Sequence, residues 1–200
     1  MENNIKKNYK VILLGDNYNG TTCLLRRFIY HEYDPNKYSY YAYSIEKNII
    51  LENRKKVSFL FWDLYDHYNY YTLQKIYIKD SHGVMLTYDI TKRSSFENAK
   101  DRLNRIKEDF NEILVFALVG LKCDSFLDEQ VREEEARNFA DDNNMMFYLT
   151  SAKDSINVDE CFNGVMNEII RKDAIVNGNK DLINLNNMKR ERPSKKGCLK

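Results

Sequence analysis

The sequence is poor in the residues that interrupt regular structure. Its 200 residues include 7 Gly and 2 Pro, which excludes a collagen-like chain and a Pro/Gly-rich disordered chain. Hydrophobic residues make up 43% of the chain, which is enough to bury the core of a domain of ordinary size. We therefore expect the chain to fold as a single globular domain.

Cysteine and long apolar runs are also scarce. The four cysteines, at positions 23, 123, 161 and 198, form no CxxC pair, so they indicate neither a zinc site nor a disulfide framework. The longest apolar runs, at 11–14 and 113–119, are far too short to span a membrane, and the N-terminus lacks the apolar segment of a signal peptide. These absences predict a cytoplasmic protein.

The chain has no large excess of either charge. Its net charge is +1, from 31 Lys and Arg against 30 Asp and Glu. This balance argues against a general electrostatic grip on nucleic acid, and no nucleic-acid partner is expected. The charge is unevenly placed, because residues 189–200 hold six cations and one anion. The basic character therefore lies in a short C-terminal tail.

Short apolar runs alternate with segments of helical spacing. The runs predict buried strands at 10–14, 57–62, 83–88, 113–119 and 146–149. Apolar stripes predict helices at 96–110 and 158–170, and two more are expected after Gly20 and through 132–142. This order predicts an α/β fold with a mostly parallel sheet covered on both faces.

Two segments depart from this alternation. Residues 43–62 contain two apolar stretches separated by the polar ENRKK, a pattern that predicts an antiparallel hairpin at a sheet edge. Beyond Arg171 the apolar periodicity fails, and Asn-rich then basic residues follow. We therefore predict a folded domain over 1–175 and a flexible basic tail over 176–200.

A glycine-punctuated loop follows the first predicted strand. It reads Gly15, Asp16, Asn17, Tyr18, Asn19, Gly20, Thr21, Thr22. This is the pattern GxxxxGK[ST] of a phosphate-binding loop, except that Thr21 stands where lysine belongs. Backbone N–H groups and the start of the next helix would hold phosphate, and the Thr22 hydroxyl would ligate Mg²⁺. A strand-to-helix turn that binds no phosphate is the other interpretation of this loop taken alone.

Three later loops carry further motifs at the ends of predicted strands: Trp62-Asp63, Leu121-Lys122-Cys123-Asp124 and Ser151-Ala152-Lys153. With them, residues 8–172 resemble the Ras superfamily of small GTPases, and the Rab branch most closely. The resemblance implies a P-loop NTPase small G-domain, with a mostly parallel six-stranded sheet, one antiparallel edge strand and helices on both faces. It implies GTP or GDP and Mg²⁺ as ligands.

The resemblance also implies how guanine would be recognised. Asp124 would accept hydrogen bonds from the base, the Lys122 stem would pack along it, and the Ala152 N–H would donate to its O6. Leu121 replaces the asparagine that ties the base loop to the phosphate loop in the family, and Tyr33 would stack on the base edge. Outside the phosphate loop, the nucleotide-binding residues implied are Cys23, Tyr33, Asp63, Lys122, Asp124, Ser151, Ala152 and Lys153. A solvated turn is the alternative for Lys122 and Asp124.

The catalytic motif of the family is altered here. Its DTAGQ aligns with Asp63-Leu64-Tyr65-Asp66-His67, so the carboxylate that holds Mg²⁺ through water is present. Asp66 replaces the glycine that senses the γ-phosphate, and His67 replaces the glutamine that positions water. The Mg²⁺-binding threonine of the first switch aligns with Tyr40, or with Ser39. His67 either positions the attacking water or is simply solvated, so we assign no catalytic residue.

These departures predict weak nucleotide binding and slow or absent hydrolysis. Loss of the phosphate-loop lysine removes a charge-assisted contact of roughly 1.5–3 kcal/mol, about ten- to more than hundredfold in affinity. Hydrolysis in the family depends on positioning and charge stabilisation, and both the lysine and the glutamine are missing. The chain is thus identified as a Rab-like regulator of vesicle traffic. The alternative is a nucleotide-independent pseudo-GTPase that acts as an effector-binding module.

Tyrosines gather in the two predicted switch segments, at positions 38, 40, 41, 43, 65, 68, 70 and 71. They are either anchors for effector proteins or a product of strand propensity and composition.

At the C-terminus, Cys198 and the basic tail provide the two signals for residence on the cytosolic face of a membrane. Cys198 is third from the end, so the CaaX rule fails, and a free thiol is the alternative. An exchange factor and the prenylation machinery are the other partners implied.

Overall fold

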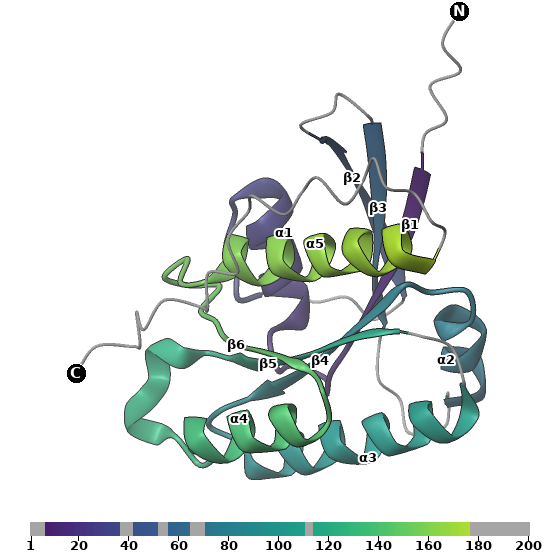
Figure 1. The fold of residues 1–200 in the computed structure, drawn as a ribbon. Coiled ribbons are helices and arrows are strands. Elements are labelled where there is room, and N and C mark those ends of the chain that lie inside the picture. Colours follow the sequence, from purple (N-terminus) through teal and green to yellow (C-terminus); the bar gives the residue numbers. More distant parts are fainter. Residues whose placement is uncertain (1–6, 37–41, 52–55, 65–70, 111–113, 177–200) are drawn as a thin grey trace, which may run out of the picture.

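A six-stranded sheet organises the described part of the chain (Figure 1). The computed structural model describes residues 7–36, 42–51, 56–64, 71–110 and 114–176. The strands are β1 (Lys7–Leu14), β2 (Tyr43–Ile50), β3 (Lys56–Leu64), β4 (Gly83–Asp89), β5 (Val115–Leu121) and β6 (Met146–Leu149). The helices are α1 (Thr21–Tyr30), α2 (Tyr71–Ile78), α3 (Arg93–Asp109), the 3₁₀ helix η2 (Cys123–Asp128), α4 (Glu133–Asp142) and α5 (Val158–Val176).

The strand order is β2-β3-β1-β4-β5-β6. Strand β2 runs antiparallel to β3, whereas the other neighbours pair in parallel. The predicted α/β fold, with one antiparallel strand at the edge of a mostly parallel sheet, is therefore confirmed. Because β1 lies inside the sheet, its side chains at 11–14 are buried on both faces, which explains the unbroken apolar run there.

Two apolar clusters cover the two faces of the sheet. Helices α1 and α5 pack on one face with Val11 and Leu13 of β1. Helices α3 and α4 pack on the other face with Ile12 and Leu14. Figure 1 shows these helix pairs on opposite sides of the sheet. The first cluster is centred on aromatic rings, and Phe28 of α1 stacks on Phe162 of α5 with their ring centroids 4.1 Å apart.

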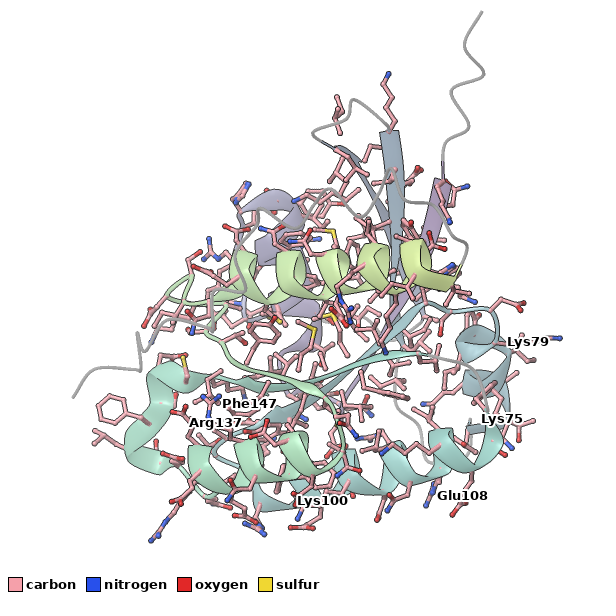
Figure 2. All side chains as sticks on the ribbon, viewed as in Figure 1. Lys75, Lys79, Lys100, Glu108, Arg137 and Phe147 are labelled. Atoms are coloured by element: carbon pink, nitrogen blue, oxygen red, sulfur yellow. The ribbon has the colours of Figure 1, made fainter. Side chains whose placement is uncertain are left out.

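Some elements differ from the predicted ones. The strand predicted at 113–119 is observed at Val115–Leu121, and the helix predicted from 96 begins at Arg93. Helix α2 was not expected, because among its residues only Gln74 and Ile78 are buried and no apolar stripe results. Polar contacts fix this helix instead. Figure 2 shows Lys75 of α2 near the last turn of α3, where its ammonium lies 2.8 Å from Asp109 Oδ1.

The predicted division into a domain over 1–175 and a tail over 176–200 stays a prediction, because 177–200 fall outside the described residues. Within the part of the chain that the structure describes, every helix is too short or too polar to cross a membrane.

The aromatic stack between α1 and α5 gives a stability prediction. Phe162 is fully buried, and its replacement in Phe162→Ala leaves a cavity against Phe28 and Phe61. We expect the free energy of unfolding, measured by urea denaturation, to fall by about 3–5 kcal/mol. The matched control is Phe126→Ala, because Phe126 is 42% exposed and its loss should cost at most about 0.5 kcal/mol. Equal losses in the two variants would contradict this packing.

Candidate nucleotide-binding site

The predicted site residues lie where the parallel strands end. The phosphate loop follows β1, Asp63 is near the end of β3, and Lys122 follows β5. Ser151 comes two residues after β6 ends. Because parallel strands present their carboxyl ends at one edge of the sheet, these loops share that edge. Ligands of open α/β sheets bind there.

Both glycines of the phosphate loop are required by its backbone. A Cβ on Gly15 would lie 1.9 Å from Thr87 Oγ1, so only glycine allows the loop to pass this close to β4. Gly20 has φ 106°, a left-handed value that favours glycine, and directly precedes α1. The loop also turns tightly between these glycines, where the Asn19 N–H donates to the Asp16 carbonyl over 3.2 Å. This geometry places the first turn of α1, which contains no acidic residue, at the loop.

The Thr21 side chain does not point into the site as a lysine ammonium at this position would; it is used inside the protein. Its side chain is buried, and its Oγ1 lies 2.8 Å from Thr87 Oγ1. The Thr87 hydroxyl donates to the Leu14 carbonyl, so Thr21 is the donor to Thr87. The Thr21 hydroxyl is therefore used inside the protein and supplies no cation to the loop.

Asn19 is the second polar residue buried within the loop. It is 0% exposed, and neither atom of its carboxamide has a hydrogen-bond partner among the described residues. A buried amide without a partner is costly in a folded protein. Asn17 is half-buried and Tyr18 is 65% exposed, so the side chains of the loop differ widely in environment.

Thr22 and Asp63 come together as a candidate Mg²⁺ site. The Thr22 hydroxyl donates to Asp63 Oδ2 over 2.6 Å. Burial raises the pKa of Asp63 to about 6, and the hydrogen bond from Thr22 opposes that rise. Among the described residues there is no cluster of three or more His, Cys, Asp or Glu that would hold a metal alone. One hydroxyl and one carboxylate nevertheless fit Mg²⁺, which keeps water and phosphate oxygens as its other ligands.

Asp124 and Ser151 meet on the side expected to bind the base. The Ser151 hydroxyl donates to Asp124 Oδ1 over 2.7 Å, and the Cys123 N–H donates to the Thr150 carbonyl over 3.1 Å. Lys153 Nζ lies 3.9 Å from Asp124 Oδ2. These contacts join the loop after β5 to the loop after β6. They hold the Asp124 carboxylate, which is only 12% exposed, in a fixed position.

Lys122 is fixed as firmly as Asp124. Its ammonium donates to Asp89 Oδ2 over 2.6 Å, and the Asp89 side chain is fully buried. A Cβ built on Gly20 would lie 3.8 Å from Lys122 Cε and 4.0 Å from Leu121 Cδ1. Both residues therefore border the phosphate loop at Gly20.

Sequence patterns missed Arg27, which joins three segments at the base side. Its Nε donates to the Ala152 carbonyl over 2.7 Å, and its two terminal nitrogens donate to the carbonyls of Lys153 and His31. The guanidinium carbon also lies 5.9 Å from the centroid of the Tyr33 ring. The α1 helix thereby fixes both the loop after β6 and the aromatic residue expected at the base.

Other predicted residues have neighbours of their own. The Cys23 Sγ donates to the Asp34 carbonyl over 3.5 Å, and burial raises the pKa of this thiol. Asp16 is bound by Asn98 and Arg102 of α3, two further residues that sequence patterns missed. Asp66, His67, Ser39 and Tyr40 lie outside the described residues, as do the switch tyrosines other than Tyr43 and Tyr71.

Comparison with known proteins agrees with this geometry. Residues 10–171 match the model of the Ras family. The chain belongs to the Ras family. Among its relatives, the GTP-binding protein ypt3 of Schizosaccharomyces pombe is 37% identical over 82% of this chain and 76% of that protein. Ras-related protein Rab-13 of Rattus norvegicus is 31% identical over 82% of this chain and 81% of that protein. Ras-related protein RABD2c of Arabidopsis thaliana is 34% identical over 77% of this chain and 76% of that protein.

These relatives place the chain on the Rab branch of the small GTPases, as predicted.

Arg27 gives a prediction for the base side of the site. Replacing it in Arg27→Met removes the donors to three carbonyls, and we expect the free energy of unfolding to fall by about 1–2 kcal/mol in urea denaturation. The control is Arg171→Met, because Arg171 pairs only with its α5 neighbour Glu168 among the contacts resolved, and exposed pairs contribute little. A loss no larger than that of the control would show that Arg27 does not stabilise these loops.

Proposed function

We propose that this chain is a Rab-type guanine-nucleotide-binding regulator of membrane traffic, with weakened nucleotide affinity and slow or absent GTP hydrolysis. The proposal rests above all on the hydrogen bond from Thr22 to the buried Asp63 carboxylate. This contact brings together a hydroxyl and a carboxylate beside the start of α1, and these two side chains would hold Mg²⁺ there. When bound, Mg²⁺ would neutralise phosphate charge and orient the diphosphate.

Each part of the nucleotide has its own set of residues in this proposal. The backbone N–H groups of 16–22 and the start of α1 bind the phosphates. The Asp124 carboxylate, oriented by Ser151, accepts hydrogen bonds from the guanine edge, while the Lys122 stem flanks the base. Tyr33, with the Arg27 guanidinium on its ring, packs at the base edge. The relative ypt3 is named a GTP-binding protein, which supports guanine nucleotide as the ligand.

Weak affinity for nucleotide is expected because, in the described part of the chain, no cationic side chain beside the phosphate loop is free to bind phosphate. Thr21 donates to Thr87, so the loop has no ammonium of its own. Lys122 is paired with Asp89, so its charge is largely compensated. The diphosphate is then bound mainly by backbone dipoles and Mg²⁺, without the roughly 1.5–3 kcal/mol of a charge-assisted side-chain contact.

Binding of effector proteins is a second role, favoured by exposed apolar residues on α2. Leu73 and Ile76 are 48% and 66% exposed, and their spacing places them on one face of that helix. Trp62 of β3 packs on Tyr77 beside them, with the ring centroids 5.0 Å apart. This surface supports effector recognition, whether or not nucleotide switches it. We keep a nucleotide-independent interaction module as the alternative function.

Calorimetric titration with GDP and GTP tests nucleotide binding. In Mg²⁺ buffer we expect dissociation constants in the micromolar range, because the phosphate-loop cation is absent. Chelation of Mg²⁺ should weaken binding, and Thr22→Ala should weaken it about tenfold and remove most of the Mg²⁺ dependence. Absence of both heat and thermal stabilisation at millimolar nucleotide would contradict the proposal and favour the interaction module.

The tail gives a separate prediction about membranes. A lipid on Cys198, together with the basic residues before it, would hold the protein on the cytosolic face of a membrane. We expect Cys198→Ser to shift the protein from the membrane pellet to the supernatant when cells that carry prenylation enzymes are fractionated. Ser194→Ala, in the same tail, should leave the partition unchanged. Retention of Cys198→Ser in the pellet would contradict the lipid site.

A further inference from the structure

The phosphate loop has an unfavourable charge of its own. Among residues 15–22, Asp16 is the single residue that is charged at neutral pH, and the lysine position holds Thr21. The loop sequence thus contributes a net negative charge to a site proposed to bind a diphosphate. Two anions close together repel strongly where water is partly excluded, so this carboxylate requires compensation.

Helix α3 provides that compensation from one face. Arg102 donates from Nη2 to Asp16 Oδ1 over 2.6 Å, and Asn98, four residues earlier, donates from Nδ2 to Oδ2 over 2.9 Å. Both oxygens of the Asp16 carboxylate therefore receive a donor.

This ion pair is shielded from solvent. The Arg102 side chain is 11% exposed and that of Asp16 is 21% exposed. By contrast, the side chains of the pair between Arg93 and Glu97 on the same helix are 44% and 47% exposed. Water screens the second pair well and the first pair poorly, so the charge of Arg102 acts on the phosphate loop with greater strength.

We propose that Arg102 is the positioning cation on which phosphate binding by this chain depends, because it neutralises Asp16 and holds the phosphate loop against α3. The inference rests on the proposed nucleotide-binding function. It assigns to a residue far along the chain part of the electrostatic role that the loop lysine has in the phosphate-loop pattern. Arg102 acts through Asp16 and through the field at the loop, and it is not a catalytic residue.

A contact that only holds the loop against α3, with no effect of its charge, predicts different nucleotide affinities for the variants. If the contact served only to hold the loop in place, removing either partner would break the same tie, and Arg102→Gln and Asp16→Asn would weaken nucleotide binding alike. If charge is decisive, the two substitutions have opposite signs. Arg102→Gln leaves the Asp16 carboxylate without an opposite charge, although Asn98 still donates to it, whereas Asp16→Asn removes the anion and leaves the cation.

The experiment is a double-mutant cycle on the full chain, with GDP and Mg²⁺ in calorimetric titration at fixed salt. We expect Arg102→Gln to bind GDP at least tenfold more weakly than the wild type. Asp16→Asn should bind GDP as tightly as the wild type or up to tenfold more tightly. The variant with both substitutions should return to within about threefold of the wild type, because the loop is then neutral again.

Arg105→Gln is the matched control, since Arg105 lies one turn further along α3, is exposed and has its guanidinium carbon 5.8 Å from the Tyr71 ring centroid. It should leave GDP affinity unchanged. Circular dichroism and urea denaturation establish that each variant is folded. If Arg102→Gln does not fold, Asp16→Asn and the double variant still decide between the charge and the mechanical roles.

Equal weakening by Arg102→Gln and Asp16→Asn overturns the inference, as does a double variant that binds GDP as weakly as Arg102→Gln. Wild-type affinity in Arg102→Gln also overturns it, while the proposed function stands. A folded wild-type protein that binds no GDP overturns the proposed function itself and this inference with it.

Discussion

The close approach of Gly15 to Thr87 fixes the phosphate loop to the sheet. Any side chain at Gly15 would collide with Thr87 Oγ1, so the loop backbone lies directly against β4. The same Thr87 hydroxyl donates to the Leu14 carbonyl and accepts from Thr21. One side chain of β4 therefore joins the end of β1, the loop and the first residue of α1. The direction in which α1 presents its free N–H groups depends on this junction.

Fixed ion pairs replace a free cation around this junction. Lys122 is paired with the buried Asp89, and Arg102 is paired with Asp16. Each pair is close to neutral, so neither leaves a free ammonium or guanidinium to attract phosphate, and the desolvation of both partners offsets much of their mutual attraction. A site built in this way keeps the shape of a nucleotide pocket while attracting phosphate less strongly than a free ammonium would. Shape and affinity are thus separate properties of this fold.

The sequence predicted the sheet better than it predicted the contacts between loops. Buried parallel strands such as β1 and β5 appear as unbroken apolar runs, so their positions were evident to within a few residues. Helix α2 was missed because polar contacts at Lys75 fix it, and no apolar stripe marks it. Local patterns identified the loops at the strand ends, since glycine spacing and short polar motifs mark them.

The partners of those loops were not predictable in the same way. Arg27 and Arg102 look in the sequence like ordinary solvent-facing cations of amphipathic helices. Their contacts with residues 152–153 and with Asp16 join positions more than eighty residues apart. Such pairings depend on how the helices pack on the sheet, which a single sequence does not encode as a local pattern.

The stack of Phe28 on Phe162 joins the first and the last helix that the structure describes. Helix α1 starts at the phosphate loop near the N-terminus, and α5 is the last helix described. Part of the apolar face of α1 is therefore completed by residues that are synthesised more than a hundred positions later. The packing of α1, which begins at the phosphate loop, is therefore complete only when α5 has docked on it. A chain shortened within α5 would lose packing on α1, the helix that follows the phosphate loop.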